Sequence, residues 1–310
     1  MPLYLSEADV ASLVTPAEAL PVLEACFRRL ADGVVENVPR RRLTFPDGSL
    51  AVLAAADTEL GFAGQKSYTV VNGVASAVVC LFSLDDGAFA AVIEADRLGQ
   101  VRTGAASGVA AAHLARTGAA TLGLIGCGKQ AESQLDAIRA AVPTIERAFA
   151  WCRTPERLAE FCDRTGAEPA ESGQDAAGCH VVVTITTAKD PVLRGEWLQE
   201  GALVCAAGAN RPQARELDNV VLQRAAFVCC DSKEQARLES GDLIDPVEVG
   251  VLDWLEVHEL QEVVAGAVSG RQAETDIVVF KSNGLAAWDV AIAAEVLRRA
   301  RELGVGRELS

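Results

Sequence analysis

The sequence has 310 residues, the length of one large or two modest domains. Half of the residues are hydrophobic and 23% are charged, so a packed core is available and general disorder is excluded. The formal charge of −15 argues against a protein that holds nucleic acid or an anionic membrane, because both need a basic surface. An anionic small molecule stays compatible with this charge if basic side chains gather locally.

No targeting or membrane-spanning pattern is evident. The first ten residues, MPLYLSEADV, are acidic and lack the layout of a signal peptide, and the uncharged stretch 67–84 predicts paired strands. The nine cysteines are scattered without a Cys-x-x-Cys pair, which is typical of buried thiols in a reducing cytoplasm. The only histidines are His113, His180 and His258, and they are far apart in the sequence, so we predict no metal site.

The N-terminal part predicts helices followed by hairpins. Ser6 and Thr15 are expected helix N-caps, and the basic run Arg40–Arg42 follows the second helix. Short apolar runs are then separated by Asn72-Gly73 and by Asp85-Asp86-Gly87, which are turn sequences typical of hairpins. This pattern predicts an antiparallel sheet with flanking helices.

From about residue 115 the pattern changes to alternating strands and helices. The apolar runs TLGLIG, AFAWC, HVVVTIT, ALVCAAG and FVCCD are separated by helical segments until about Phe280, which predicts a parallel sheet. The final segment, LAAWDVAIAAEVLRRARELG, predicts one long helix that adds no strand and packs back on the first domain. We therefore expect an α/β protein with a discontinuous domain (1–114 plus 286–310) and a Rossmann-type domain (115–285).

A glycine motif opens the second domain. Residues 126–131 read G-x-G-x-x-A, directly after an apolar strand and at the start of a helix. Gly126 suits the tight turn, Gly128 leaves room for a pyrophosphate, and Ala131 permits close contact between helix and sheet. The helix N-terminus favours the negative charge of a phosphate. The motif predicts a dinucleotide cofactor, the alternative being a glycine turn without a ligand.

The end of the following strand bears on the choice of cofactor. NAD-binding domains usually place an acidic residue there to accept a hydrogen bond from the ribose. In this chain the first carboxylate after the strand AFAWC is Glu156. Arg153 and Thr154 instead suit a 2′-phosphate. We predict NADP, and the alternative is that Arg153 is solvated and NAD is accepted as well.

Several stretches together resemble the ornithine cyclodeaminase/mu-crystallin family over nearly the whole chain. They are VRTGAAS (101–107), LGLIGCGKQA, HVVVTITTAKDPVLRGEWLQEGALVCAAGANRP, ARELD, CDSKEQARLESGDL and VVFKSNGLAAWDVA. The resemblance implies a Rossmann domain and a discontinuous α+β domain that binds substrate and pairs two subunits in a homodimer. It also implies a small α-amino or α-imino acid substrate and hydride transfer at the α-carbon.

The resemblance places the substrate carboxylate on three basic residues, Arg40, Lys66 and Arg102. Three cations in an acidic protein form a local anion trap, and arginine grips a carboxylate with two hydrogen bonds. The alternatives are an exposed Arg40 replaced by a neighbouring arginine, and an Arg102 that only serves an ion pair. Lys66 is the expected proton source, because burial lowers the pKa of a lysine.

The resemblance also assigns further site residues. Glu239 resembles a position in the substrate pocket, with a surface helix residue as the alternative. The expected cofactor contacts are Thr103, Gly126, Gly128, Lys129, Gln130, Arg153, Thr154, Thr186, Asn210 and Ser282.

Two departures from the cyclodeaminating members guide the choice of reaction. Those members carry carboxylates where this chain has Ala51 and Asn210, and carboxylates there handle an amine and move protons. The segments GANRPQARELD and WCRTPER are closer to the mu-crystallin type, the ketimine reductases. We predict reduction of a cyclic ketimine carboxylate such as pyrroline- or piperideine-2-carboxylate.

Three other functions remain open at this point. One is ornithine cyclodeamination, with Asp57, Glu59 or Glu239 supplying the missing carboxylate. The second is an alanine-type amino-acid dehydrogenase, and the third is a protein that binds a ligand without turnover.

Overall fold

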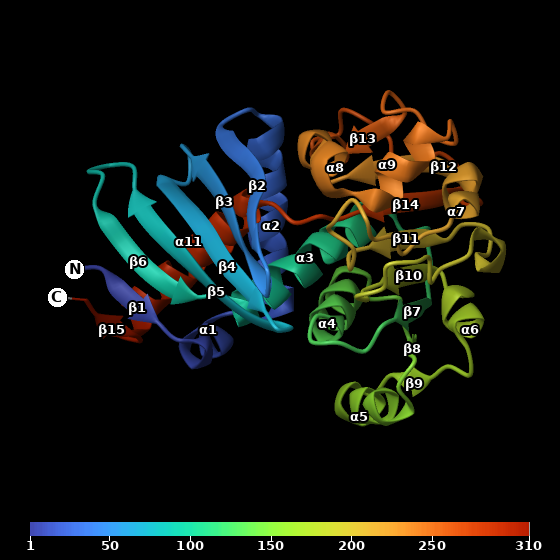
Figure 1. Cartoon of the computed structure of the whole chain (residues 1–310), viewed down its shortest axis with the longest axis horizontal. Helices are drawn as coiled ribbons and strands as arrows, with labels where there is room; N and C mark the ends of the chain where they lie inside the picture. The colour runs from blue at the N-terminus through green and yellow to red at the C-terminus, as the bar shows by residue number, and fades with distance from the viewer. Residues whose placement is uncertain (310) are drawn as a thin grey trace. The chain divides into compact units, whose positions relative to one another are not determined.

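The computed structural model describes residues 1–309, which divide into two compact units (Figure 1). The first unit is Met1–Arg102 together with the chain from Gly284 onward, and the second is Thr103–Asn283. Helix α3 (Asp96–Leu114) contains the first boundary, so the expected border after residue 114 falls at the end of that helix.

The first unit is built on a seven-stranded sheet with the strand order β15-β1-β6-β5-β4-β3-β2. Strands β2 to β6 pair as antiparallel neighbours, whereas β1 is parallel to β6. The elements are β1 (Leu3–Leu5), α1 (Glu7–Leu13), α2 (Pro16–Ala31), β2 (Val35–Phe45), β3 (Gly48–Asp57), β4 (Phe62–Val71), β5 (Val74–Ser83), β6 (Phe89–Glu94), α11 (Ala286–Leu303) and β15 (Arg307–Glu308).

Local sequence signals account for these elements. The side chains of Ser6 and Thr15 accept hydrogen bonds from the backbone N–H groups of Asp9 and Glu18, so both predicted caps are confirmed. The turn between β4 and β5 has positive φ at Asn72 (49°) and at the following glycine (79°), as a two-residue hairpin turn requires. The basic run 40–42, which the sequence left unassigned, lies within β2.

One face of this sheet is covered by α11. Alternate residues of β3, including Ala51, Leu53 and Ala55, are buried on that face, and α11 packs against β2 to β5 and against α2 (Figure 1). The segment 285–304 packs back on the first unit without adding a strand, as expected, and the short strand β15 that follows it pairs with β1. Two residues carry too little pattern for sequence analysis to detect.

The second unit is built on an eight-stranded parallel sheet, with helices between its strands. Its elements are β7 (Thr121–Ile125), α4 (Ala131–Ala141), β8 (Arg147–Trp151), α5 (Pro155–Thr165), β9 (Glu168–Pro169), α6 (Gly173–Ala177), β10 (Val181–Thr184), η1 (Gly195–Trp197), β11 (Leu203–Ala206), α7 (Asn219–Arg224), β12 (Ala225–Cys230), α8 (Lys233–Glu239), α9 (Gly241–Glu248), β13 (Val257–Glu259), α10 (Leu260–Val264) and β14 (Ile277–Lys281).

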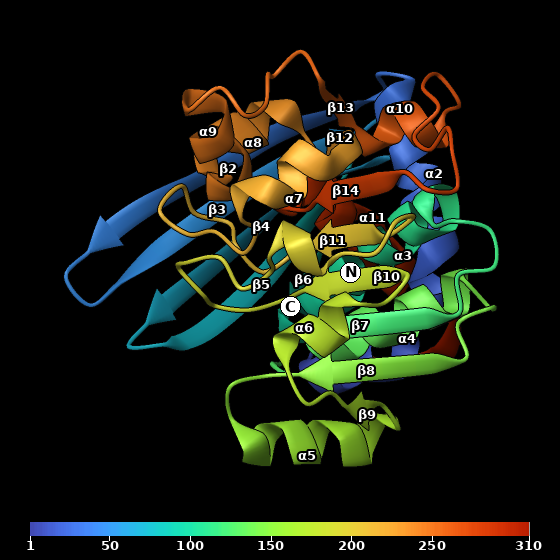
Figure 2. The ribbon, with the colours of Figure 1, turned by 90° about the vertical axis from the view of Figure 1, so that its right-hand side faces the viewer.

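The strand order of this sheet is β13-β12-β14-β11-β10-β7-β8-β9, and Figure 2 shows the strands stacked in this sequence. Successive strands first run outward from β7 through β8 to β9, and the chain then returns to the other side of β7 at β10. The order therefore reverses between β7 and β10, and in open parallel sheets ligands bind beside such a point, outside the carboxyl ends of the strands. The predicted Rossmann-type fold is confirmed.

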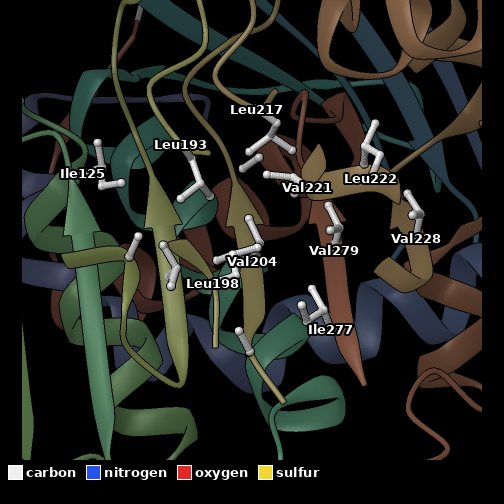
Figure 3. Close-up of a cluster of buried hydrophobic side chains, with 14 of the residues drawn as sticks. Ile125, Leu193, Leu198, Val204, Leu217, Val221, Leu222, Val228, Ile277 and Val279 are labelled. Atoms are coloured by element: carbon white, nitrogen blue, oxygen red, sulfur yellow. The ribbon is translucent and has the colours of Figure 1, made fainter. Parts of the chain in front are cut away.

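The core of the second unit lies against the strands of this sheet. Figure 3 shows Ile125, Val204, Val228 and Val279 from four strands, together with Leu222 of α7. Strands β10 and β14 are buried along their whole length, which explains their continuous apolar runs.

No single helix among residues 1–309 has the length and apolar character needed to cross a bilayer. Only α1 and α2 taken together meet that test, by length and composition, and the two are bent by 83° at the break between them.

Candidate active site

A cavity of about 540 Å³ opens at the carboxyl ends of β7, β8 and β10 in the second unit. Its walls come from the glycine loop, from the start of α5, from the start of α6 and from the segment after β10. The lining residues are Ile125–Gly128, Trp151–Thr154, Arg157, Ser172–Gln174, Ile185–Ala188, Pro191, Val192, Arg194 and Trp197. The cavity therefore lies where the strand order reverses.

The glycine loop leaves room for a phosphate. Gly126 has a φ of +117°, and a Cβ there would approach the carbonyl oxygen of Ile185 to 2.5 Å, so only glycine fits. A Cβ at Gly128 would meet no atom within 4 Å, because this residue borders open space. The loop is held by a 2.8 Å hydrogen bond from Gly126 N to Trp151 O. These features fit the pyrophosphate of a dinucleotide.

The cavity wall is basic. Arg153 and Thr154 border it, and so do Arg157 and Arg194, which the sequence analysis did not select. Among residues 1–309, no aspartate or glutamate lines the cavity. Arg194 lies over the ring of Trp197 at 5.6 Å, and such a stacked pair is hard to recognise from spacing alone.

Five of the ten predicted cofactor residues line this cavity: Gly126, Gly128, Arg153, Thr154 and Thr186. The other five border other parts of the second unit. Thr103 lies on α3 at the start of the unit, and its carbonyl accepts a hydrogen bond from Gln134. Lys129 and Gln130 precede α4, Asn210 follows β11, and Ser282 follows β14.

A buried carboxylate fixes the loop that carries Thr186. Glu216 Oε1 accepts hydrogen bonds of 2.7 Å from both N and Oγ1 of Thr186, and Oε2 accepts one of 2.7 Å from Gly208 N. Burial raises the pKa of Glu216. Nearby, Lys281 Nζ lies 3.0 Å from Asp242 Oδ2, and both side chains are fully buried. Sequence analysis noted the ARELD segment but assigned no role to its glutamate.

The predicted anion trap forms a cluster in the first unit. Lys66 Nζ lies 3.0 Å from Asp289 Oδ1, and Arg102 Nε lies 3.2 Å from the same oxygen. Arg40 donates a hydrogen bond of 3.2 Å to the carbonyl of Gly284, in the chain that enters α11. All three basic side chains are buried. The arrangement gathers positive charge as the sequence predicted, and it adds one acidic partner.

A bulge in β2 orients Arg40. Between the paired residues Val38 and Arg41 the register shifts, so that two residues, Pro39 and Arg40, oppose Leu53 of β3. Leu53 in turn pairs with Lys66 of β4. Arg40 and Lys66 therefore flank the same residue from neighbouring strands, as bulges that redirect a side chain allow. The alternative of an exposed Arg40 does not hold, whereas Arg41 is exposed.

Asp289 on α11 is the residue of this cluster that sequence analysis missed. Its neighbour Trp288 is fully buried, and the guanidinium of Arg102 lies 5.7 Å from the centre of that ring. Arg102 thus does serve an ion pair, as one alternative held, but in a cluster with two further cations. Burial lowers the pKa of Lys66, and the Asp289 carboxylate opposes that effect.

The remaining acidic candidates belong to other elements. Asp57 is buried at the end of β3, where Arg29 Nε lies 2.7 Å from its Oδ2, and Glu59 is exposed in the following turn. Glu239 ends α8 in the second unit, is buried, and accepts a 2.7 Å hydrogen bond from Gln235. Ala51 is fully buried, which leaves an apolar surface where cyclodeaminating members carry a carboxylate.

Comparisons with known proteins agree with this description. The chain is 36% identical to the Delta(1)-pyrroline-2-carboxylate reductase of Bacillus cereus over 79% of this chain and 75% of that protein. The structure of the Thermococcus litoralis Delta(1)-pyrroline-2-carboxylate reductase in complex with NADH and L-proline matches with a TM-score of 0.94, 31% identity and coverage of 99% of this chain and 100% of that one.

A dimeric archaeal alanine dehydrogenase with bound NAD matches with a TM-score of 0.93 and 33% identity, over 100% of this chain and 99% of that one. The model of the ornithine cyclodeaminase/mu-crystallin family matches residues 2–304. The resemblance drawn from the motifs is confirmed, and this chain belongs to the ornithine cyclodeaminase/mu-crystallin family.

Proposed function

We propose that the protein is an NAD(P)-dependent oxidoreductase that reduces a small cyclic imino acid, such as pyrroline- or piperideine-2-carboxylate. The observation that carries this proposal is the cluster of Arg40, Lys66 and Arg102, three buried cations in a chain of net charge −15. When bound, a nicotinamide cofactor supplies the hydride. The relatives named pyrroline-2-carboxylate reductase support the substrate class.

The cations have distinct tasks in this proposal. Arg40 and Arg102 hold the substrate carboxylate, and fixing that group orients the imine carbon for transfer. Lys66 provides the proton that the imine nitrogen needs when its carbon is reduced. A lysine with a lowered pKa suits this task, because it releases a proton more readily than an exposed one.

A panel of assays tests the reaction. Purified protein is incubated with NADPH or NADH and with each of the two cyclic imines, and cofactor oxidation is followed together with formation of the ring amino acid. The proposal requires imine-dependent oxidation that yields proline or pipecolate. Binding of the imine without turnover would contradict it.

Alanine-type dehydrogenation is the second candidate, favoured by the similarity to the archaeal alanine dehydrogenase. It predicts oxidation of the cofactor with pyruvate and ammonia at a rate that matches or exceeds the rate with cyclic imines. Adding pyruvate with ammonia to the panel separates the two, because the open-chain imine must form from free ammonia.

We further propose that NADPH is preferred over NADH. Arg153 and Thr154 line the cavity, and the cavity wall offers no carboxylate to a ribose hydroxyl. The two related structures carry NADH and NAD, so this chain would differ from them in its cofactor. Tighter binding of NADH than NADPH at equal ionic strength would refute the preference.

A homodimer is proposed from the uncovered face of the first sheet. Leu43 pairs with Leu50, and Val52 lies in one row with Val78 across β4. These four apolar residues point away from the face that α11 covers, and they are at least partly exposed. Such a face is typical of an association surface. Light scattering should give twice the chain mass, and Val78→Asp should yield monomers.

We also assign the protein to the cytoplasm. All nine cysteines are free thiols, and five of them are buried. Free thiols persist in a reducing compartment. Fractionation of the native cells tests this assignment.

A further inference from the structure

Arg157 borders the same cavity as Arg153 and was not part of the sequence-based site. It lies in the first turn of α5, one helical turn after Arg153, and both side chains are exposed. Among residues 1–309 neither guanidinium forms an ion pair or a side-chain hydrogen bond.

Other exposed arginines near this helix do have carboxylate partners. Acidic residues outnumber basic ones by 43 to 28, and several exposed arginines pair with glutamates. Arg164 on the same helix lies 2.7 Å from Glu132, and Arg147 lies 2.7 Å from Glu168. Arg153 and Arg157, which have no carboxylate partner among residues 1–309, give this cavity wall a local excess of positive charge.

The position of Arg157 in the first turn of α5 is also unfavourable without a ligand. The N-terminus of a helix carries partial positive charge, so cations in its first turn are destabilising. Residues whose local preference conflicts with their position in the fold are found chiefly at functional sites. An anion bound by Arg157 would remove this conflict with the helix dipole.

We propose that Arg157 is a specificity-determining residue that, with Arg153, holds the 2′-phosphate of the cofactor. The inference rests on the proposed preference for NADPH and names a second cation for it. A phosphate monoester carries a charge of about −1.5 to −2 near neutral pH, which two guanidiniums balance better than one. The ribose of NADH has no such charge, so Arg157 contributes to the binding of NADPH and not of NADH.

Binding measurements without turnover test this proposal. Dissociation constants are measured for NADPH and NADH, and for 2′-phospho-ADP-ribose and ADP-ribose as probes that lack the nicotinamide. The variants are Arg157→Ala and Arg153→Ala, with Arg164→Ala as the matched control, since it lies on the same helix outside the cavity. Circular dichroism confirms that each variant is folded.

Arg157→Ala is expected to weaken both 2′-phosphorylated ligands about tenfold or more, the size of a lost charge-assisted hydrogen bond. Binding of NADH and ADP-ribose should change less than about twofold, and Arg164→Ala should change neither class. The inference is overturned if Arg157→Ala weakens both classes equally or neither class.

The outcomes also separate this inference from the proposal on which it rests. If the unmodified protein prefers NADPH and only Arg153→Ala removes that preference, Arg157 has no role while the cofactor preference stands. If the unmodified protein binds NADH more tightly and Arg153→Ala changes nothing, the preference itself fails, and Arg157 falls with it.

Discussion

Lys66 and Asp289 form a buried ion pair, with Nζ 3.0 Å from Oδ1 and exposed side-chain fractions of 7% and 1%. The two residues are 223 positions apart, on β4 and α11. The same oxygen also receives Arg102. One carboxylate thus contacts two of the three cations that we assign to the substrate, and it holds them close together.

Asp289→Asn should destabilise the protein. It removes the one acidic partner shared by two buried cations, and breaking a buried pair in this way costs about 3–5 kcal/mol. Denaturant unfolding measures the loss. The control is Glu168→Gln, which breaks an exposed pair with Arg147 and should leave the unfolding midpoint unchanged. Equal stability of Asp289→Asn and the unmodified protein would contradict the buried pair.

The rate of imine reduction should fall as the pH rises toward the alkaline range. Lys66 donates only while protonated, and burial lowers its pKa from the ordinary value of 10.5, so the fall begins at a lower pH than for an exposed lysine. The stability of the fold should change in the opposite direction. The unfolded chain binds this proton more tightly than the folded protein does, so the free energy of unfolding rises with pH between the lowered pKa and 10.5. Lys66→Arg stays protonated but does not release its proton, so its kcat should be lower and should lack the alkaline fall. A profile that is identical in both enzymes would exclude Lys66 as the donor.

Arg40→Ala should raise the KM for the imino acid about tenfold or more, since a charge-assisted hydrogen bond to a carboxylate is lost. The dissociation constant of NADPH should stay unchanged, because Arg40 belongs to the first unit and the glycine loop to the second. Arg41→Ala is the matched control, as the exposed neighbour on the same strand. If both variants behave alike, the bulge at Pro39 and Arg40 does not place the substrate cation.

Arg153→Asp should shift the cofactor preference toward NADH. The change removes a phosphate partner and supplies the carboxylate that a ribose hydroxyl requires. The ratio of kcat/KM for NADPH and NADH, measured with one imine at a fixed salt concentration, reports the shift. A ratio equal to that of the unmodified protein would show that Arg153 is only a solvated residue.

Ornithine should not be converted to proline at an enzyme-like rate. Ala51 is buried and offers no carboxylate to the side-chain ammonium, and Asn210 cannot take and return a proton. General acid–base help of that kind is typically worth about 10²–10⁴ in rate. Asp57 does not replace it, because that carboxylate pairs with Arg29. Ornithine incubated with catalytic NAD(P)⁺ is assayed for proline and ammonia, and release of both in equal amounts would reverse this conclusion.

The sequence by itself determined the elements whose signals are local. The caps at Ser6 and Thr15, the turn at Asn72 and the glycine loop at Gly126 each depend on a few adjacent residues, so their conformation follows from residue type. The alternation of apolar runs and helices identified the parallel sheet, because strands buried on both faces are apolar throughout.

The tertiary structure alone decided which distant residues meet. The β2 bulge that turns Arg40 inward has no sequence signature, because it depends on the register with β3. Asp289 lies in an Ala-rich helix and becomes a partner of Lys66 only when α11 packs on the sheet. Arg157 resembles any first-turn arginine until α5 is placed beside the cavity. Charges act through space over a few ångströms, so their partners are set by packing and not by separation along the chain.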